Sequence, residues 1–315
     1  MTNMNLFNHT INDWKSWENL FQSFQSIDAF SPLIEKIFAI HNLPMDTKKI
    51  QNLAPSTNAV FRVGDYVAKI LVPEESGFNT ESDYNTEIFG MNHAAKNGVP
   101  IPEVIACGSI SDKYFFRYIV MKYIDGEPLS DVRKYLSPDE KFAVGKEIRK
   151  IIRRLNVKTE RFNDIDVFGD AEKNERWDKF SDKFNAERIE FIRRNKNKPL
   201  VYVHGDLHAA NIIIDRSTNN KIYIIDFADS YSAPHEYELP STIFSFICGH
   251  GDAGLAKGFL DGDDIQEFAE RCFFGLMLHD FGADIIGDIV AHQDINSIKS
   301  IYEVKELILQ KFFEI

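Results

Sequence analysis

The spacing of apolar residues near the N-terminus predicts helix. Large side chains recur there at intervals of three and four residues, which gives an amphipathic pattern over residues 1–43. We expect a helical extension over residues 1–45 that packs on the domain that follows. The apolar stripe consists of Trp14, Trp17, Leu20, Phe21 and Phe24.

From residue 50 onward the apolar residues form short runs that are typical of β-strands. Residues 59–63 and 66–71 are two β-prone runs joined by Gly64-Asp65, which predicts a hairpin. A helical pattern follows over residues 81–97, with Tyr84, Ile88, Met91 and Ala95 on its predicted buried stripe. Two more strands are predicted near 103–109 and 114–123, ahead of Asp125-Gly126.

Beyond Gly126 the chain is mainly helical in pattern. Ser137, followed by proline and then by Glu140, is typical of a capped helix start. We therefore expect an α+β protein of two lobes, with a small β-rich lobe over 46–124 and a larger, mostly helical lobe over 125–315.

Composition narrows the class of protein. The chain has 315 residues, of which 44% are hydrophobic, so it can build more than one core. Three separated cysteines give no disulfide framework, and no apolar run of about 20 residues occurs. The first residues lack a basic segment followed by an apolar run, so we expect no signal peptide. We expect a cytoplasmic protein without membrane contacts, either a monomer or a homodimer.

The negative charge is concentrated near the C-terminus. Residues 226–315 contain 17 Asp and Glu against 5 Lys and Arg, a net charge of −12, which equals the net charge of the whole chain. Such a field repels nucleic acid and attracts cations, so no nucleic-acid partner is expected. A solubilising acidic surface explains the same count equally well.

The chemistry lies between residues 200 and 230. A β-prone run leads into the polar loop His204-Gly205-Asp206-Leu207-His208, and a second run opens at Asn211. A third run ends in Ile225-Asp226-Phe227, so antiparallel pairing of the second and third runs brings Asn211 near Asp226. A carboxylate, an amide and a second carboxylate suit phosphoryl transfer, in which Mg²⁺ bridges phosphates and an acid orients the acceptor hydroxyl.

These motifs resemble those of aminoglycoside phosphotransferases and their choline-kinase relatives, which share the two-lobed protein-kinase-like fold. The resemblance covers about residues 50–300. It implies that Asp206 is the catalytic base or hydroxyl-orienting residue, and that Asn211 and Asp226 bind Mg²⁺. His204 would brace the loop. A zinc site at His204 and His208 lacks a third ligand at suitable spacing.

The first lobe supplies the expected nucleotide contacts. Lys69 lies in an apolar strand, and Glu87 lies in the helix that follows. A kinase needs such a pair, because the lysine binds the nucleotide phosphates and the glutamate holds the lysine. By the resemblance, Ser56, Thr57 and Asn58 form the loop over the phosphates of ATP or GTP. The backbone of the hinge segment Met121, Lys122, Tyr123 and Ile124 would bind the base.

The acidic C-terminal third predicts that the molecule that accepts the phosphoryl group is cationic. An aminoglycoside is the first choice of acceptor. An enzyme that phosphorylates aminoglycosides would confer antibiotic resistance. Choline, homoserine, methylthioribose, an amino sugar or a macrolide remain alternatives, as do a pseudokinase and a protein kinase. Glu238 matches a structural acid of the family. The predicted substrate contacts are Asp229, Glu236, Asp261, Asp263, Asp264 and Glu267.

Overall fold

The computed structural model describes residues 6–7, 26–46, 49–53, 57–248, 251–290 and 295–315. The chain forms two compact units that alternate along the sequence. The sheet unit comprises Met1–Asn85 and Pro102–Asp125, and the helical unit comprises Thr86–Ile101 and Gly126–Ile315. Part of the predicted small lobe, residues 86–101, therefore groups with the helical unit.

The sheet unit is built on five antiparallel strands in the order β1-β2-β3-β5-β4. The predicted hairpin at Gly64-Asp65 is confirmed, because β2 and β3 pair directly across it. The strands are β1 (Ile50–Asn52), β2 (Ala59–Val63), β3 (Tyr66–Ile70), β4 (Val104–Ser111) and β5 (Phe115–Lys122).

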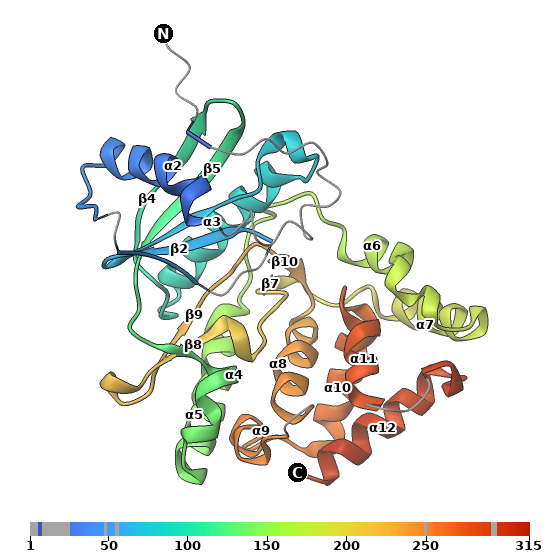
Figure 1. Ribbon diagram of the computed structural model, residues 1–315. Coiled ribbons are helices and arrows are strands. Elements are labelled where there is room, and N and C mark those ends of the chain that lie inside the picture. The colour runs from blue at the N-terminus through green and yellow to red at the C-terminus, as the bar shows by residue number, and fades with distance from the viewer. Residues whose placement is uncertain (1–5, 8–25, 47–48, 54–56, 249–250, 291–294) are drawn as a thin grey trace. The chain divides into compact units, whose positions relative to one another are not determined.

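Helix α2 (Ile27–Ile40) packs on this sheet (Figure 1). Ser26 caps the helix by accepting a hydrogen bond from the Ala29 N–H. Phe30 contacts Phe61 of β2 with a ring-centroid distance of 5.3 Å, in one continuous apolar cluster. The helix predicted around Trp14 and Trp17 lies outside the described residues.

Helix α3 (Thr80–Lys96) passes from the sheet unit into the helical unit. The predicted apolar stripe is only partly its buried face, because Met91 is buried but Tyr84 and Ile88 are half-buried and Ala95 is exposed. The buried positions include Thr86, Glu87 and Gly90. An added Cβ at Gly90 would collide with the Phe227 side chain, so glycine permits the close approach of helix α3.

The helical unit contains a short hairpin among its helices. Helix α5 begins at the predicted site, where Ser137 and Glu140 form a reciprocal capping box. Strands β8 and β9 pair with Ile212 opposite Ile224, and β7 pairs with β10.

The bounds of the helical unit's elements follow. They are β6 (Glu127–Pro128), α4 (Leu129–Val132), α5 (Pro138–Leu155), α6 (Val167–Lys173), α7 (Asp182–Asn195), β7 (Val201–Val203), β8 (Ile212–Asp215), β9 (Lys221–Ile224), β10 (Tyr231–Ala233), α8 (Glu238–Ile247), α9 (Ala253–Phe259), α10 (Ile265–Leu278), α11 (Gly282–Val290) and α12 (Ile301–Phe313).

Candidate active site

The loop that follows strand β7 requires glycine at its second position. Gly205 has φ of +84°, a left-handed conformation that costs other residues about 1–2 kcal/mol. An added Cβ would also overlap the backbone carbonyl oxygen of Asp229. The loop therefore turns tightly against residue 229 and directs the chain into Asp206.

Asp206 and Asn211 are joined directly by hydrogen bonds. The Asn211 Nδ2 donates to the Asp206 carbonyl oxygen at 2.9 Å and to its Oδ2 at 3.2 Å. Because both bonds use the amide nitrogen, they orient the Asn211 side chain and leave its Oδ1 available to a cation. Asn211 is only 8% exposed, so this orientation is held by packing as well.

His208 contacts the same carboxylate, with 3.3 Å between its Nε2 and the Asp206 Oδ2. Burial lowers the pKa of His208, but the hydrogen bond and the charge of Asp206 outweigh burial, so the pKa is raised. His208, whose Nδ1 accepts a hydrogen bond from the Ala210 N–H, and the Asn211 amide thus hold one oxygen of Asp206 from two sides.

Asp226 follows strand β9, whose pairing with β8 brings it to the level of Asn211. The Ile225 N–H donates to the Asn211 carbonyl oxygen at 3.1 Å, which fixes this register. Asp226 adopts φ of +66°, an unfavourable conformation for a residue with a side chain, and such conformations concentrate at functional sites. The hairpin geometry predicted from the sequence is therefore present.

His204 contacts the residues on both sides of Asp226. The Asp206 N–H donates to the His204 Nδ1, which leaves the proton on Nε2 to be donated to the Ile225 carbonyl oxygen at 3.0 Å. The His204 ring also lies 4.8 Å from the ring of Phe227, centroid to centroid. Burial lowers the pKa of His204, so the ring is neutral and acts as a structural support.

A buried glutamate holds the start of the loop. Glu238 is fully buried at the beginning of α8, and its Oε2 accepts a hydrogen bond of 2.6 Å from the His204 N–H. The Gly205 backbone also bonds to this carboxyl group. Burial raises the pKa of Glu238 to about 7, which agrees with a structural rather than a substrate-binding acid.

The donor set fits Mg²⁺ better than zinc. Among the described residues no group of three or more His, Cys, Asp and Glu could enclose a metal ion. Mg²⁺ does not need such a cage, because it retains water ligands and shares phosphate oxygens with the protein. The oriented Asn211 Oδ1 and the Asp226 carboxylate are oxygen donors of the kind it prefers.

Comparison with known proteins agrees with this geometry. The family described as "Phosphotransferase enzyme family" matches residues 50–274. The chain belongs to this family. It is accordingly a phosphotransferase that acts on a hydroxyl group of a small molecule.

Solved structures share the α+β protein-kinase-like fold of this phosphotransferase. A GDP complex of aminoglycoside 2'-phosphotransferase-IIIa is 16% identical, with a TM-score of 0.60 over 92% of this chain and 99% of that one. ADP-bound aminoglycoside phosphotransferase APH(2'')-Ib is 19% identical, with a TM-score of 0.53 over 89% and 98%. A streptomycin–ATP complex of APH(2")-IIa is 20% identical, with a TM-score of 0.50 over 89% and 96%. At these identities the likeness establishes the fold.

In the phosphotransferase's sheet unit, Lys69 lies in β3 and is 4% exposed. Glu87, in the part of α3 that belongs to the helical unit, is 1% exposed. Burial of a charged side chain is costly unless an opposite charge or a ligand compensates it. Both residues are therefore buried charged groups, and their part in nucleotide binding stays a prediction.

The predicted loop over the phosphates is described only in part. Ser56 lies outside the described residues. Asn58 Oδ1 accepts a hydrogen bond from the Val72 N–H at 3.3 Å, which ties the end of this loop, beside Thr57, to the segment that follows β3.

The predicted hinge has fewer available donors than expected. The Lys122 N–H donates to the Glu103 carbonyl oxygen at 2.8 Å, and the Tyr123 N–H donates to that of Asp65 at 2.9 Å. These two donors are used within the sheet unit. A base would therefore have to be bound by the Ile124 N–H or by carbonyl groups of the segment from Met121 onward.

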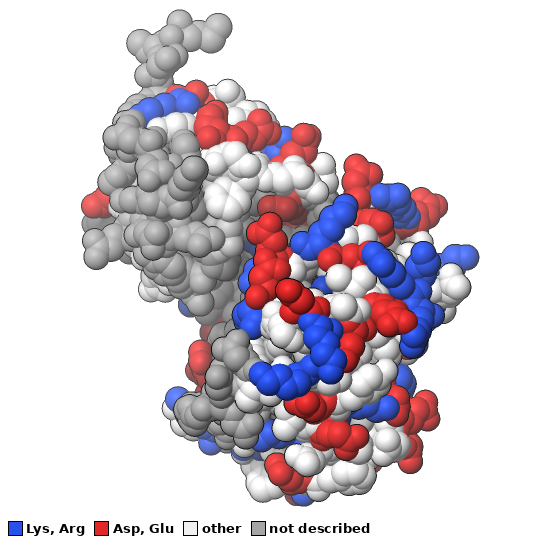
Figure 2. All heavy atoms as spheres, turned by 90° about the vertical axis from the view of Figure 1, so that its right-hand side faces the viewer, with Lys and Arg blue, Asp and Glu red and all other residues white. Residues whose placement is uncertain are grey.

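Most of the predicted substrate acids have structural partners. Asp261 pairs with Lys146 at 2.6 Å, and Asp264 caps helix α10 by accepting the Glu267 N–H. On the face drawn in Figure 2, acidic and basic side chains are correspondingly interspersed. No single acidic patch covers that face. The other pairs are Asp263 with Arg149 at 3.1 Å and the buried Glu236 with Lys198 at 2.6 Å.

A pocket beside the catalytic loop contains acids that the sequence argument missed. Its volume is about 190 Å³, and Asp170, Asp280, Tyr231 and Tyr237 line it together with apolar side chains. Tyr231 of β10 lies opposite Val203, the residue directly before His204, so this wall continues into the loop of Asp206. Of the residues that line this pocket, only Tyr231 and Tyr237 could have been identified from the sequence, because they are aromatic and follow Asp226 closely.

The charge of the Asp280 carboxylate in this pocket is compensated only in part, although Arg176 lies 3.8 Å away and Asn174 donates a hydrogen bond to it. Burial raises the pKa of Asp280, the Arg176 charge opposes this only in part, and nearby Asp170 and Asp284 raise the pKa further. The rings of Tyr231 and Tyr237 meet edge to face at 5.6 Å. Carboxylates and aromatic rings together favour an ammonium group.

In the described part of the chain, none of the helices combines the length and apolarity that crossing a membrane demands.

Proposed function

We propose that this phosphotransferase moves the γ-phosphoryl group of a nucleoside triphosphate onto a hydroxyl of a cationic small molecule, with an aminoglycoside as the preferred class. The observation that carries the proposal is the bonded pair of Asp206 and Asn211, placed by the hairpin next to Asp226. Such a set can orient a hydroxyl and hold a metal at neighbouring points.

Each residue then has a distinct task. Asp206, oriented by Asn211 and His208, would accept or orient the proton of the acceptor hydroxyl. Asn211 and Asp226 would hold Mg²⁺, which when bound neutralises charge on the phosphates. Lys69, positioned by Glu87, would bind the phosphates, and Ser56, Thr57 and Asn58 would cover them.

The nucleotide would bind at the segment from Met121 to Ile124. The similar proteins solved with GDP, ADP or ATP support nucleotide use without fixing the base. With two N–H groups of this segment already used, we expect carbonyl groups and the Ile124 N–H to make the contacts to the base.

The pocket of Asp170 and Asp280 is our proposed site for the acceptor's ammonium groups, in place of most of the acids predicted from the sequence. Asp229 remains a candidate, because its carbonyl oxygen lies against Gly205, next to Asp206. A cation there would relieve the repulsion between the two pocket carboxylates. The similar protein solved with streptomycin and ATP supports this acceptor class.

A kinase for another small metabolite is the alternative, and choline is the form that the aromatic pocket favours. We also retain a nucleotide-binding pseudokinase, which the presence of Asp206, Asn211 and Asp226 disfavours.

The test is nucleotide turnover with Mg²⁺ and either ATP or GTP, against kanamycin, streptomycin, choline, homoserine, methylthioribose and a macrolide. We expect turnover with a polycationic aminoglycoside, and Asp280→Asn should raise its KM about tenfold with little change in kcat. Glu306→Gln, on an exposed position of α12, is the matched control and should leave KM unchanged. Turnover only with an uncharged acceptor would refute the cationic class.

A further inference from the structure

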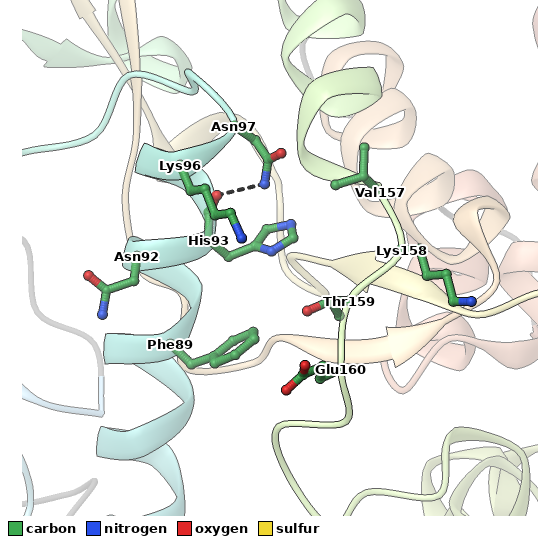
Figure 3. Close-up of a pocket in the computed structure, with 9 residues that line it drawn as sticks. All are labelled: Phe89, Asn92, His93, Lys96, Asn97, Val157, Lys158, Thr159 and Glu160. Atoms are coloured by element: carbon green, nitrogen blue, oxygen red, sulfur yellow. Dashed lines mark hydrogen bonds between the residues drawn. The ribbon is translucent and has the colours of Figure 1, made fainter.

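A groove lies on the C-terminal half of α3, apart from the residues assigned above. It runs between this helix and the segment that follows α5, and its volume is about 600 Å³, within the range of small-molecule sites (Figure 3). All of it belongs to the helical unit. The lining residues are Phe89, Asn92, His93, Lys96, Asn97, Val157, Lys158, Thr159 and Glu160.

The aromatic side of the groove is fixed in place. The Phe89 ring stacks on Phe162 at 4.3 Å with an interplanar angle of 6°, and the His93 ring stacks on Tyr202 at 4.2 Å. The His93 Nε2 also bonds to the Leu155 carbonyl oxygen at 2.9 Å. Because these contacts restrain both rings, a ligand would lose little free energy in ordering this side.

His93 lines the groove with an uncharged side chain that is only 9% exposed. Burial lowers its pKa, and the nearby Lys96 charge acts in the same direction, which outweighs the bond to Leu155. The Asn97 Nδ2 donates to the His93 carbonyl oxygen at 2.8 Å, which secures the end of the helix. Neutral rings restrained in this way suit a planar apolar group.

Opposite charges stand on the two sides of the groove. Lys96 extends from α3 alongside His93, and the Glu160 carboxylate is turned toward α3 near Phe89 (Figure 3). Both residues are exposed, and neither takes part in an ion pair with another described residue. Lys158, by contrast, extends away from α3 (Figure 3).

We propose that this groove is a second ligand site, for a small zwitterion that carries a planar ring, as an aromatic amino acid does. Lys96 would bind the acidic group, Glu160 would bind the ammonium group, and the ring would lie on Phe89 and His93. The site is independent of phosphoryl transfer, since it includes none of the residues assigned to that reaction.

The test compares three probes that share an indole ring: L-tryptophan, tryptamine and indole-3-acetate. Binding to the full chain is measured by ligand-observed NMR titration. L-tryptophan should bind more tightly than either probe that lacks one charge, by roughly two- to fivefold per charge. Lys96→Gln should remove the advantage over tryptamine, and Glu160→Gln should remove the advantage over indole-3-acetate.

Lys158→Gln is the matched control, because it removes a neighbouring charge that does not face the groove. It should leave all three affinities unchanged. The proposal is overturned if the three probes bind equally, if none binds, or if Lys158→Gln has the same effect as Lys96→Gln. All three substitutions are on the surface, so folding should not be impaired, and loss of kinase activity would not affect the result.

Discussion

The ionisation of Glu238 should make the stability of this protein depend on pH in an unusual direction. Its carboxyl group is buried against the backbone of the catalytic loop, and burial raises its pKa from 4.5 to about 7. Between these two values an unfolded chain releases the proton while the folded chain retains it. Ionisation in this interval therefore favours unfolding, and the stabilising contribution of the protonated group is lost as pH rises.

The size of the effect follows from the two pKa values. At about 1.4 kcal/mol for each pH unit between them, the free energy of unfolding should fall by about 3 kcal/mol from pH 4.5 to pH 7. Above pH 7 the group is ionised in both states, and its contribution becomes constant. A loss of this size is a large part of the stability of most domains.

Glu238→Gln is the perturbation that isolates this contribution. The glutamine can still accept the His204 N–H, but it has no proton to release. Urea unfolding followed by circular dichroism, at several pH values from 4.5 to 8, should show the wild type losing about 3 kcal/mol relative to the variant. Glu267→Gln, at an exposed helix start, should instead follow the wild type. Parallel stability curves for wild type and Glu238→Gln would refute the assignment of a raised pKa.

Three further substitutions test the site and its support. Asp226→Ala should abolish Mg²⁺-dependent nucleotide binding in calorimetric titrations, and binding that persists unchanged would remove Asp226 from the metal site. Gly205→Ala should cost at least about 2 kcal/mol in thermal or urea unfolding, because its φ of +84° and the Asp229 carbonyl both oppose a side chain. Ser137→Ala should cost about 1 kcal/mol through loss of the α5 cap while kcat stays unchanged. A change in kcat would contradict a purely structural role for that cap.

Local features were the part of the fold that could be predicted from the sequence. The Ser137 cap and the Gly64-Asp65 hairpin depend on residues a few positions apart, and both are present. The hairpin between Asn211 and Asp226 is likewise local, and its pairing fixes their relative register.

Long-range partners could not be predicted in this way. Counting charges suggested an acidic substrate surface, but Lys146 pairs with Asp261 from 115 positions away. The buried face of α3 was predicted only in part, for a related reason. Periodicity counts apolar residues, whereas Gly90 is buried because Tyr202 and Phe227 approach it closely.

The residues of the acceptor pocket could not be predicted from the sequence either. Asp170 and Asp280 lie 110 positions apart in the sequence, and neither belongs to a recognisable motif. Only the folded chain brings them together, beside the strand that leads into His204.

Transfer of label from γ-³²P-labelled ATP or GTP to kanamycin, with Mg²⁺, tests the central claim most directly. The account predicts labelled kanamycin with the wild type, and at least about 10²-fold less with Asp206→Asn although nucleotide still binds. Label found only in free phosphate, or equal labelling of kanamycin by wild type and Asp206→Asn, would contradict it.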